Sequence, residues 1–578
     1  MDRMRAPLLL VTTGVTLALL AAGAPSSAPV ASSSHARTIS TPVASISSPD
    51  GPAEDTEVLA AKVARVNLSV DARAGRHAIS PLIYGVNYAG QTPGLSSAFT
   101  VPVDRWGGNS TSRYNYTNDT YNTGQDWYFE NIVSDPESTL TAFVDGDRSH
   151  GSASLVTVPM VGWVAKTSPS EHPFLCSFPR TSFASQNDFD YWDNNCGNGT
   201  SGNTQLVADP ATTSTSVGAA FDQAMVSSLV SRYGTAANGG VKFYELDNEP
   251  VLWNSTHRDV HPAALTAGEL WNKSKATADA VKTADATAGV VGPSDWGWCA
   301  YYYSAAEDCG QSPDAASRGG LPLGAWYLQQ FATAQGTGGT RLLDYFDEHF
   351  YPQENGVALN SAGSSATQAL RLRSTRGLWD PAYSDESWIS DANGGTPLQW
   401  IRTMKKWVAV YYPGTKTAIT EYNWGGLESM NGALAQADVL GVFGREGLDL
   451  ATLWGPTKAS DPWAYAFRMY RNYDGKSHQF GNNAIKGTTA NEGRLAVYAA
   501  TRSNDGALTV MVINKTHSTI PSTLSVKNFA GKSKASVYRY SSAHLTKIVK
   551  QSSVSVHSAK LKTSFPGYSI TLLVLPKR

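Results

Sequence analysis

The sequence predicts an α/β protein: a (β/α)8 barrel, or TIM barrel, with a smaller C-terminal antiparallel β-sandwich domain. Between residues 80 and 455, eight short β-rich runs alternate with helical patterns. Beyond residue 482, apolar residues recur with period two instead. The 578 residues are 41% apolar and 10% aromatic, which is enough for one large core and a smaller one. We expect a signal peptide over residues 1–24, a spacer over 25–62, an N-terminal strand within 63–80 that joins the sandwich, the barrel over 81–481 and the sandwich over 482–578.

The N-terminal segment has the pattern of an export signal. Arg3 and Arg5 precede an apolar stretch over residues 8–22, and Ala22-Gly-Ala24 offers the small-x-small pattern that a signal peptidase reads. The apolar stretch is too short to span a bilayer. Residues 25–62 are rich in Ser, Ala, Pro and Thr without hydrophobic periodicity, which is typical of a flexible spacer. We expect a secreted, extracellular protein with no membrane attachment after signal cleavage.

The eight predicted barrel strands are short runs of apolar and β-branched residues, and helical segments lie between them. One helical segment is marked by Phe221, Met225 and Leu229, and it ends near Gly234. Another is expected to open with a capping box, Thr266-Ala-Gly-Glu269. The strands are expected at 82–87, 101–106, 155–163, 241–246, 289–294, 345–350, 417–422 and 448–454, and a third helix at 400–411, before Pro413-Gly414.

The C-terminal domain is predicted from alternating residues around a turn. Residues 495–499 and 508–512 alternate, and Asn504-Asp-Gly506 between them predicts a hairpin. Further strands are expected at 523–526, 535–540 and 568–575, together with an isolated strand at 64–70 that would join them. The chain would then start and finish in the same small domain.

The four cysteines predict disulfides rather than a metal site. An even number in an exported chain allows three pairings, and the short spacings favour Cys176 with Cys196 and Cys299 with Cys309. No C-x-x-C motif is present, and the H-x-x-x-H at residues 257–261 lacks an adjacent Glu, so no metal ligands are predicted. Asp145-Gly-Asp147 could contribute to a structural calcium site, although a solvated loop is the favoured interpretation. Catalysis is expected to need no cofactor.

Composition points to a neutral, polar ligand. With 46 basic and 48 acidic residues the net charge is −2, so nothing suggests the cationic surface that nucleic acid or anionic lipid would require. Only 16% of residues are charged, whereas Trp and Tyr are abundant, at 16 and 26. We expect a neutral, polar ligand such as a sugar, no nucleic acid, and a monomeric protein.

Two glutamates follow predicted barrel strands, where active sites of this fold are built. Glu249 follows the fourth strand and Glu421 ends the seventh, so both can face the barrel mouth. Glycosidic bond cleavage needs such a pair: one carboxyl protonates the leaving oxygen and the other meets the developing oxocarbenium ion. Retention requires a carboxyl separation of about 5 Å and inversion about 6.5 to 9.5 Å, so the sequence leaves the stereochemistry open.

Four motifs are spaced along the chain: RWGGNSTSRYN at 105–115, DWYFEN at 126–131, YELDNEP at 244–250 with THRDVHP at 256–262, and ITEYNWG at 419–425. From about residue 63 to the C-terminus, the chain thereby resembles glycoside hydrolase family 44. The resemblance implies a retaining endo-β-1,4-glucanase, often active on xyloglucan, with a (β/α)8 barrel and a β-sandwich. It also implies that Glu249 is the acid/base and Glu421 the nucleophile. One departure is Tyr116, where members often carry Trp, and it concerns glucan binding rather than catalysis.

Glu249 must hold a proton near neutral pH in this mechanism. We expect the negative charge of Glu421 and a partly dry pocket to raise the pKa of Glu249. Asn248 is predicted to hydrogen-bond the sugar 2-hydroxyl beside the nucleophile. Trp127 and Trp163 suit core packing and sugar stacking equally. Substrate contacts are expected from Arg105, Trp106 and Asn109 after strand two, from Asn248, from His349 and Tyr351 after strand six, and from Trp454 after strand eight.

Two alternatives remain open. The same retaining chemistry could act on mannan or xylan, because a fold does not fix the substrate. A noncatalytic carbohydrate-binding barrel would explain the aromatic residues, but not two strand-end glutamates with Asn248 beside one of them. A serine hydrolase is excluded because residues 292–296 lack the second Gly of a nucleophile elbow, and no P-loop occurs.

Overall fold

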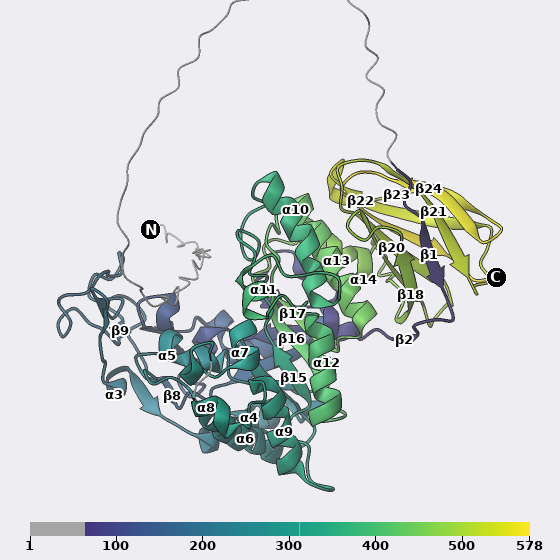
Figure 1. The fold of residues 1–578 in the computed structure, drawn as a ribbon. Helices are drawn as coiled ribbons and strands as arrows, with labels where there is room; N and C mark the ends of the chain where they lie inside the picture. Colours follow the sequence, from purple (N-terminus) through teal and green to yellow (C-terminus); the bar gives the residue numbers. More distant parts are fainter. Residues whose placement is uncertain (1–63, 311–312) are drawn as a thin grey trace, which may run out of the picture. The chain divides into compact units, whose positions relative to one another are not determined.

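The structure is a computed structural model that describes residues 64–310 and 313–578 (Figure 1). The predicted signal peptide and spacer lie outside these residues. Residues Ala64–Arg578 form one compact unit. Among the described residues, no helix has the length and apolar character needed to cross a membrane.

Eight parallel strands close into the predicted barrel, and each predicted run supplies one of them. The third run is shorter than expected: β7 ends at Val158, and residues 163–165 leave the barrel as β8 to pair with β12 (Ser214–Ser216). The barrel strands, in chain order, are β3 (Gly85–Asn87), β4 (Val103–Trp106), β7 (Ala153–Val158), β13 (Phe243–Leu246), β14 (Gly289–Asp295), β15 (Tyr345–Glu348), β16 (Lys416–Tyr422) and β17 (Leu450–Leu453).

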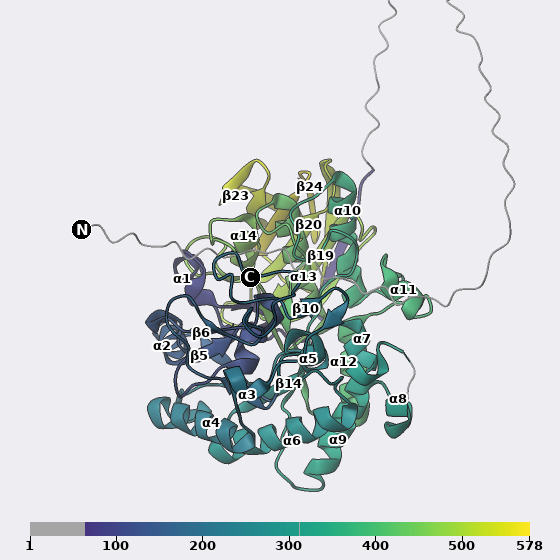
Figure 2. The ribbon, with the colours of Figure 1, turned by 90° about the vertical axis from the view of Figure 1, so that its left-hand side faces the viewer.

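Helices follow the barrel strands and cover them, and α4, α6 and α9 lie side by side in chain order (Figure 2). The three predicted helices are present as α4, α6 and α12. Only half of the predicted capping box forms: the Thr266 side chain accepts the Glu269 N–H, but Glu269 turns to His261 at 2.9 Å instead of returning to the cap. The principal helices are α1 (Leu95–Ala98), α2 (Leu140–His150), α4 (Ala219–Tyr233), α6 (Ala267–Ala284), α9 (Leu323–Gln335), α12 (Trp400–Tyr411), α13 (Met430–Glu446) and α14 (Pro462–Arg471).

Shorter elements occupy the connections around the barrel. Helices α3 (Pro210–Thr213), α5 (Trp253–Thr256), α7 (Trp298–Tyr302), α8 (Pro313–Ser317) and α11 (Trp388–Ala392) have four or five residues each, and α10 (Ser365–Ser374) has ten. The small strands are β5 (Thr120–Asn122), β6 (Glu130–Val133) and β9 (Leu175–Cys176) in one sheet, and β10 (Thr200–Ser201) with β11 (Thr204–Gln205) in another.

Two layers of side chains fill the barrel interior, because alternate residues of each strand point inward. The lower one, the apolar layer, is a cluster of buried residues, with Phe243 and Tyr345 packed edge to face. Two residues further along the strands lies the polar layer, whose members hydrogen-bond to one another. The apolar layer is Val103, Leu155, Phe243, Val291, Tyr345, Ala418 and Leu450, and the polar layer is Asn87, Arg105, Thr157, Glu245, Asp347 and Thr420.

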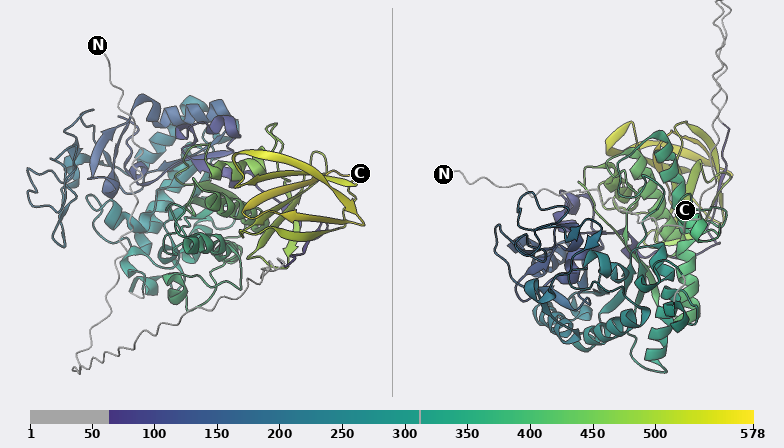
Figure 3. Two further views of the ribbon diagram at one scale, coloured as in Figure 1. Left: turned by 90° about the horizontal axis from the view of Figure 1, so that it is seen from above. Right: turned by 60° about the vertical axis from the view of Figure 1, so that its left-hand side comes forward.

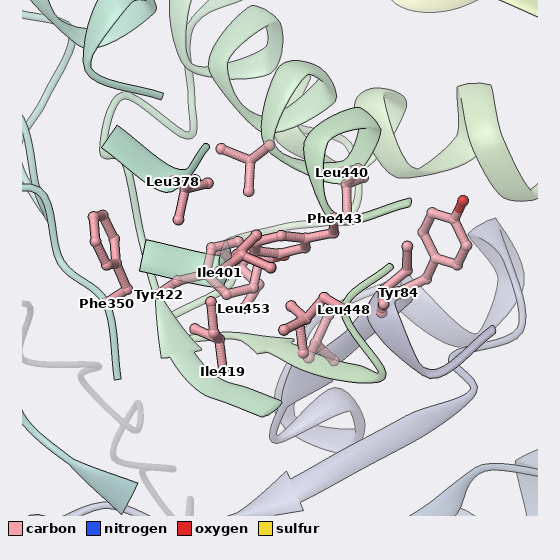
Figure 4. Close-up of a cluster of buried hydrophobic side chains, with 14 of the residues drawn as sticks. Tyr84, Phe350, Leu378, Ile401, Ile419, Tyr422, Leu440, Phe443, Leu448 and Leu453 are labelled. Carbon is pink, nitrogen blue, oxygen red and sulfur yellow. The ribbon is translucent and has the colours of Figure 1, made fainter. Parts of the chain in front are cut away.

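Helix α13 is buried along nearly its whole length, from Met430 to Gly444. Leu440 and Phe443 lie over the barrel residues Ile419, Tyr422 and Leu453 (Figure 4). A helix that is largely apolar on all sides requires cover on all sides, and strands β19 and β20 of the C-terminal domain supply it.

The contact between α13 and the C-terminal domain includes a buried ionic group. The carboxylate of Asp438 accepts hydrogen bonds from the Tyr498 hydroxyl at 2.8 Å and the Lys515 ammonium at 2.7 Å. Gly441 allows the close approach, since a Cβ there would lie 2.3 Å from the Tyr498 ring. The two parts therefore share one continuous core.

The C-terminal domain is a mostly antiparallel sheet that closes on itself (Figure 3). Strand β1 (Leu68–Asp71) closes it by pairing antiparallel with β18 and parallel with β21. The short strand β2 (His77–Ala78) adds to β18. The remaining strands are β18 (Asn483–Thr489), β19 (Leu495–Thr501), β20 (Leu508–Asn514), β21 (Ile520–Lys527), β22 (Lys534–Ser541), β23 (His544–His557), β24 (Lys560–Phe565) and β25 (Ser569–Leu575).

Both favoured disulfides form. Cys176 is joined to Cys196, and Cys299 to Cys309. The first closes a long insertion that follows β7 and includes β9 (Figure 1). Each bridge closes a local loop rather than linking distant parts of the fold.

Candidate active site

Glu249 lies just beyond the carboxyl end of β13, in a backbone conformation that is unusual for this residue type. Its φ is 46° and that of Asp247 is 63°, both in the left-handed region that a side chain disfavours. Neighbouring strands hold the turn: the Glu249 N–H donates to the Ser294 carbonyl at 3.0 Å, and the Val251 N–H donates to Asp295 at 2.9 Å. The strained turn therefore has a defined geometry, with the Glu249 side chain 14% exposed.

Glu421 reaches the same space because β16 contains an extra residue. Ile419 pairs with Ala451 and Tyr422 with Leu453, so β16 advances by three residues where β17 advances by two. Thr420 and Glu421 consequently both face the barrel interior, whereas Tyr422 points outward to Gln436 of α13. A bulge of this kind redirects a side chain at the end of a strand.

The two carboxylates lie close together. An oxygen of Glu249, a nitrogen of His349 and an oxygen of Glu421 all lie within 4.8 Å of one another. The Nδ1 atom of His349 is 2.9 Å from Glu249 Oε1 and 3.6 Å from Glu421 Oε2. Tyr351 donates its hydroxyl to Glu421 Oε2 at 2.7 Å. These side chains therefore meet where the carboxyl ends of β13, β15 and β16 lie together.

Arg105 connects the carboxylates to the polar layer. Its Nε donates to Glu245 at 2.8 Å, its Nη1 to Glu421 at 2.6 Å, and its Nη2 to the amide oxygen of Asn248 at 2.8 Å. The guanidinium is fully buried, so its charge is balanced by these two carboxylates rather than by water. Although burial opposes it, the carboxylates of Glu245 and Glu421 raise the pKa of Arg105 above its ordinary value.

The environment favours a protonated Glu249. Burial raises its pKa to about 7; the Arg105 charge opposes this and the Glu245 charge adds to it. The predicted direction is thus confirmed, although the negative neighbour that contributes is Glu245 rather than Glu421. Burial also lowers the pKa of His349, so this imidazole is neutral near pH 7. Burial and the Glu421 carboxylate raise the pKa of Tyr351 well above its usual range, which keeps its hydroxyl a donor.

A chain of amides leads from the carboxylates to a neighbouring acid. Asn248 donates its amide to Asn109 Oδ1 at 3.2 Å, and Asn109 donates to Asp126 Oδ1 at 2.9 Å. The Asn248 oxygen also accepts the Gly108 N–H at 3.2 Å. Asn248 is 2% exposed and retains one amide hydrogen for a ligand hydroxyl. Both amides predicted to bind substrate therefore belong to the site.

Three aromatic predictions have different outcomes. Trp106 alternates with the inward-pointing Arg105 and is buried against Tyr114 with ring centroids 4.6 Å apart, so its predicted sugar contact is wrong. Trp454 is half-buried beside Gly108, close to the site, and a Cβ on that glycine would lie 2.7 Å from its ring. Tyr116, the departure from the family pattern, packs against Phe221 of α4 at 4.9 Å.

His349 is placed differently from the prediction as well. It is completely buried, and its nearest partners are the two carboxylates rather than an open surface. It therefore positions the acids instead of offering a substrate contact. The prediction came from its place at a strand end, which gives the location but not the exposure.

Within the part of the chain that the structure describes, two groups of side chains could present metal ligands. They are Glu249, His349 and Glu421, and, deeper in the barrel, Glu245, Asp347 and His349. The guanidinium of Arg105 contacts an acid in each group, so a cation there would lie beside a fixed positive charge. The residues therefore favour a metal-free site, and the absence of a catalytic metal stays a prediction.

The loop suggested for calcium is instead part of helix α2. Asp145 forms an exposed ion pair with Arg232 at 2.8 Å, whereas Asp147 is buried and accepts the Ser154 hydroxyl at 2.6 Å. The two carboxylates have separate partners and do not form a shared ligand set. The helix forms because Thr139 caps it and Gly151 ends it.

Residues that sequence reasoning missed lie mainly one layer below the carboxylates. Glu245 and Asp347 are fully buried charged residues in the middle of strands. A carboxylate inside a predicted buried strand is itself a signal, because an unpaired one would be too costly. Asp126 stands in a quoted motif, but only the fold shows its link to Asn109.

The sequence profile of glycoside hydrolase family 44 matches residues 120–354. Endoglucanase A of Paenibacillus lautus is 33% identical over 475 residues, which cover 78% of this chain and 64% of that protein. β-Mannanase/endoglucanase A of Caldicellulosiruptor saccharolyticus is 30% identical over 78% of this chain and 34% of its own length. The chain thus spans less than two thirds of these two relatives.

Solved structures resemble the chain over nearly their whole length. CelM2, a bifunctional glucanase-xylanase from a metagenome library, has a TM-score of 0.84 and 41% identity over 89% of this chain and 99% of its own. A family 44 endoglucanase from Clostridium acetobutylium ATCC 824 has a TM-score of 0.75 and 32% identity over 89% and 100%. A Paenibacillus polymyxa family 44 xyloglucanase, solved with xyloglucan, has a TM-score of 0.73 and 28% identity over the same shares.

Proposed function

Because the chain belongs to glycoside hydrolase family 44, we propose that it is a retaining endo-β-1,4-glucanase that cleaves xyloglucan or another soluble β-glucan. The observation that carries this proposal is the short separation of Glu249 and Glu421, whose nearest oxygens lie within 4.8 Å. Oxygens this close suit direct attack by a carboxylate, which needs carboxyl groups about 5 Å apart, better than inversion, which needs about 6.5 to 9.5 Å for an intervening water.

In the first step Glu249 acts as the general acid. Its raised pKa, about 7, keeps a proton available for the leaving glycosidic oxygen. Glu421 attacks the anomeric carbon and forms a covalent glycosyl-enzyme. Arg105 and Tyr351 each donate to one Glu421 oxygen and thereby fix its direction of attack.

In the second step the two residues exchange tasks. The glycosyl ester leaves Glu421 without charge, and Glu249, now deprotonated, accepts a proton from the attacking water. Neutral His349 contacts Glu249 throughout and holds its oxygen in place. The free amide hydrogen of Asn248 is available to the sugar 2-hydroxyl, an interaction that strengthens in the transition state.

The site geometry supports a mechanism, but it does not by itself identify the glycan. The relatives are named as glucanase, xyloglucanase, glucanase-xylanase and mannanase, so mannan and xylan remain alternatives. A release assay of reducing ends on xyloglucan, carboxymethyl cellulose, mannan and xylan separates them. Fastest hydrolysis of xyloglucan or carboxymethyl cellulose supports a glucanase, whereas fastest hydrolysis of mannan or xylan contradicts it.

We also propose that the protein is secreted and that it is a monomer. The two disulfides suit an oxidising compartment, and the Arg3–Ala24 pattern suits export. Mass spectrometry of the protein recovered from culture medium would test it, because cleavage after the leader removes about 24 residues.

The catalytic pair is tested by single substitutions that keep shape and remove the ionisable group. Glu249→Gln and Glu421→Gln should each lower kcat on the best polymer by at least about 1,000-fold, because each removes one of the two groups that make and break the bond. Exposed Glu428→Gln, on the same mouth, is the matched control and should leave kcat unchanged.

The stereochemistry is tested on the parental protein. Proton NMR during hydrolysis of a β-glucan should detect the β-anomer of the new reducing end first, before mutarotation. Initial α-product would reject the double displacement, and near-parental turnover by both glutamine variants would reject the residue assignment.

A further inference from the structure

Four aromatic side chains cluster beside the active-site face, and we call them the aromatic platform: Trp127 and Tyr128, which are half-buried, and Tyr191 and Trp192, which are exposed. The Trp127 ring lies 5.4 Å from Tyr191 and 5.5 Å from Trp192, and Tyr191 and Trp192 are 4.2 Å apart. Tyr191 is 66% exposed and Trp192 55%. Among the described residues these are the two aromatic side chains of that exposure class. Such rings are costly to leave in water unless they meet a ligand.

Topology places the platform on the same face as the carboxylates. Trp127 belongs to the connection that follows β4, and Tyr191 with Trp192 to the insertion that follows β7. Connections that leave the carboxyl ends of barrel strands gather at the mouth of the barrel. Two separate connections therefore contribute to one surface there.

A peptide bond and two hydrogen bonds join the Trp127 segment of the platform to the site. Trp127 directly follows Asp126, which accepts from Asn109 at 2.9 Å. Asn109 in turn accepts from Asn248, the residue before Glu249, at 3.2 Å. The platform thus continues the surface on which the glucan would lie, instead of forming an isolated patch.

The insertion presents its rings on a fixed backbone. The Cys176–Cys196 disulfide closes it, and the buried carboxylate of Asp190 accepts the N–H groups of Trp192 at 3.0 Å and Asp193 at 3.2 Å. The Ser177 N–H donates to the Phe129 carbonyl at 3.1 Å and ties the insertion to the Trp127 segment. A prearranged surface loses little conformational entropy on binding a ligand.

We propose that the aromatic platform is a distal binding site for the β-glucan chain, in which Tyr191 and Trp192 stack on sugar rings beyond those held at Glu249 and Glu421. The rings suit a neutral pyranose ligand, because their faces are apolar and the edges of the sugar keep its hydroxyls in water. The inference rests on the proposed function. In this proposal the platform increases the affinity for the substrate and takes no part in bond cleavage.

The test compares a long and a short substrate. Trp192→Ala and Tyr191→Ala should each lower kcat/KM on the polymer that the parental enzyme hydrolyses fastest by about fivefold to tenfold, mainly through KM. An aryl β-cellobioside, which occupies only the positions next to the carboxylates, should be hydrolysed within about twofold of the parental rate. Val207→Ala changes an exposed apolar residue of the same insertion and should affect neither substrate.

Each result decides one question. Equal losses on both substrates would mean that the rings only support the fold of the site, and no loss on either would mean that glucan does not reach them; both overturn the proposal. A concentration-dependent dimer on gel filtration that Trp192→Ala abolishes, with unchanged kinetics, would instead identify a contact between copies.

A binding measurement keeps the two proposals distinguishable. Affinity electrophoresis in the same polymer needs no turnover, so it reports on the platform even if the parental enzyme hydrolyses neither substrate. Retardation that is lost in Trp192→Ala and kept in Val207→Ala supports the platform. Equal retardation of Trp192→Ala and the parental protein overturns it, whatever the catalytic result.

Discussion

The apolar and polar layers of the barrel interior are supplied by the same strands, yet they have opposite requirements. Phe243 and Tyr345 of the apolar layer need only the right volume and an apolar neighbour. Arg105 and Glu245 of the polar layer, only two positions further along, are fully buried and each needs a charged or hydrogen-bonding partner. The comparison shows that the two layers of one barrel have different tasks. The deeper, apolar layer stabilises the fold, and the polar layer nearer the mouth holds the functional residues in place.

The difference has an energetic consequence. Burying an apolar ring stabilises the fold by roughly 1.5–3 kcal/mol, whereas burying an ion pair is close to neutral and becomes strongly unfavourable when one partner is lost. The polar layer is therefore retained for what it holds in place, namely Glu421 and Asn248 through Arg105. Three substitutions test this interpretation, in order of expected effect.

Arg105→Met should have the largest effect, because it leaves Glu245 buried without its cation and frees Glu421. We expect a loss of about 3–5 kcal/mol in unfolding free energy and at least about 100-fold in kcat. Thermal unfolding and kcat on the best polymer measure the two effects. Arg402→Met, which removes an exposed arginine paired with Glu446, should cost less than about 1 kcal/mol, because Arg445 still pairs with Glu446.

Should Arg105→Met fail to fold, Arg105→Lys answers the same question. It keeps the charge but loses the forked geometry, so stability should recover more than activity. Activity within tenfold of the parental value in either variant would contradict the role given to Arg105.

Phe243→Ala breaks the apolar layer on the strand that also carries Glu245. The cavity should cost about 3–5 kcal/mol of unfolding free energy. Measured well below the unfolding temperature, kcat and its pH profile should stay within about twofold of the parental values, because no hydrogen bond of the polar layer involves this ring. Phe243→Leu, which keeps most of the volume, should cost less than about 1.5 kcal/mol. A shifted pH profile in Phe243→Ala would show that the layers are coupled.

Of the three substitutions, Glu249→Gln should change the unfolding free energy least, and it should raise it rather than lower it. The pKa of Glu249 is about 7 in the folded protein against an ordinary 4.5, so between these pH values the unfolded chain releases the proton first. The unfolded state then binds fewer protons, and parental stability falls as the pH rises through this window. Removing the group should add about 1–3 kcal/mol of unfolding free energy at pH 8 and none at pH 4.

Unfolding by denaturant at both pH values checks this prediction, with Glu428→Gln as the exposed control. An equal change at pH 4 and pH 8 would mean that the effect does not come from the proton on Glu249.

Elements with a strong local signal were predictable from sequence. All eight barrel strands fall on predicted apolar runs, and α12 shows the predicted period. Strand β23 was missed because most of its side chains are exposed or half-buried, so it lacks an apolar alternation. The Asp145–Asp147 segment was read as a loop although Thr139 and Gly151 cap it as a helix.

The candidate site was partly predictable for a similar reason. Polar residues at strand ends identify Glu249 and Glu421, because parallel strands present their carboxyl ends on one face. The same rule misplaced Trp106, since it ignores the alternation that turns every second side chain outward. It also could not find Glu245, which lies inside a strand rather than at its end.

By itself, the sequence determined the (β/α)8 barrel with its mostly antiparallel companion domain, the disulfide pairs and the two strand-end glutamates, because periodicity, spacing and strand ends are local properties of the chain. Only the tertiary structure decided the gap between Glu249 and Glu421, the partners of Arg105 and the burial that raises the pKa of Glu249. These depend on how strands distant in sequence are positioned around one axis and on the extra residue in β16, and no local pattern measures a distance across a barrel.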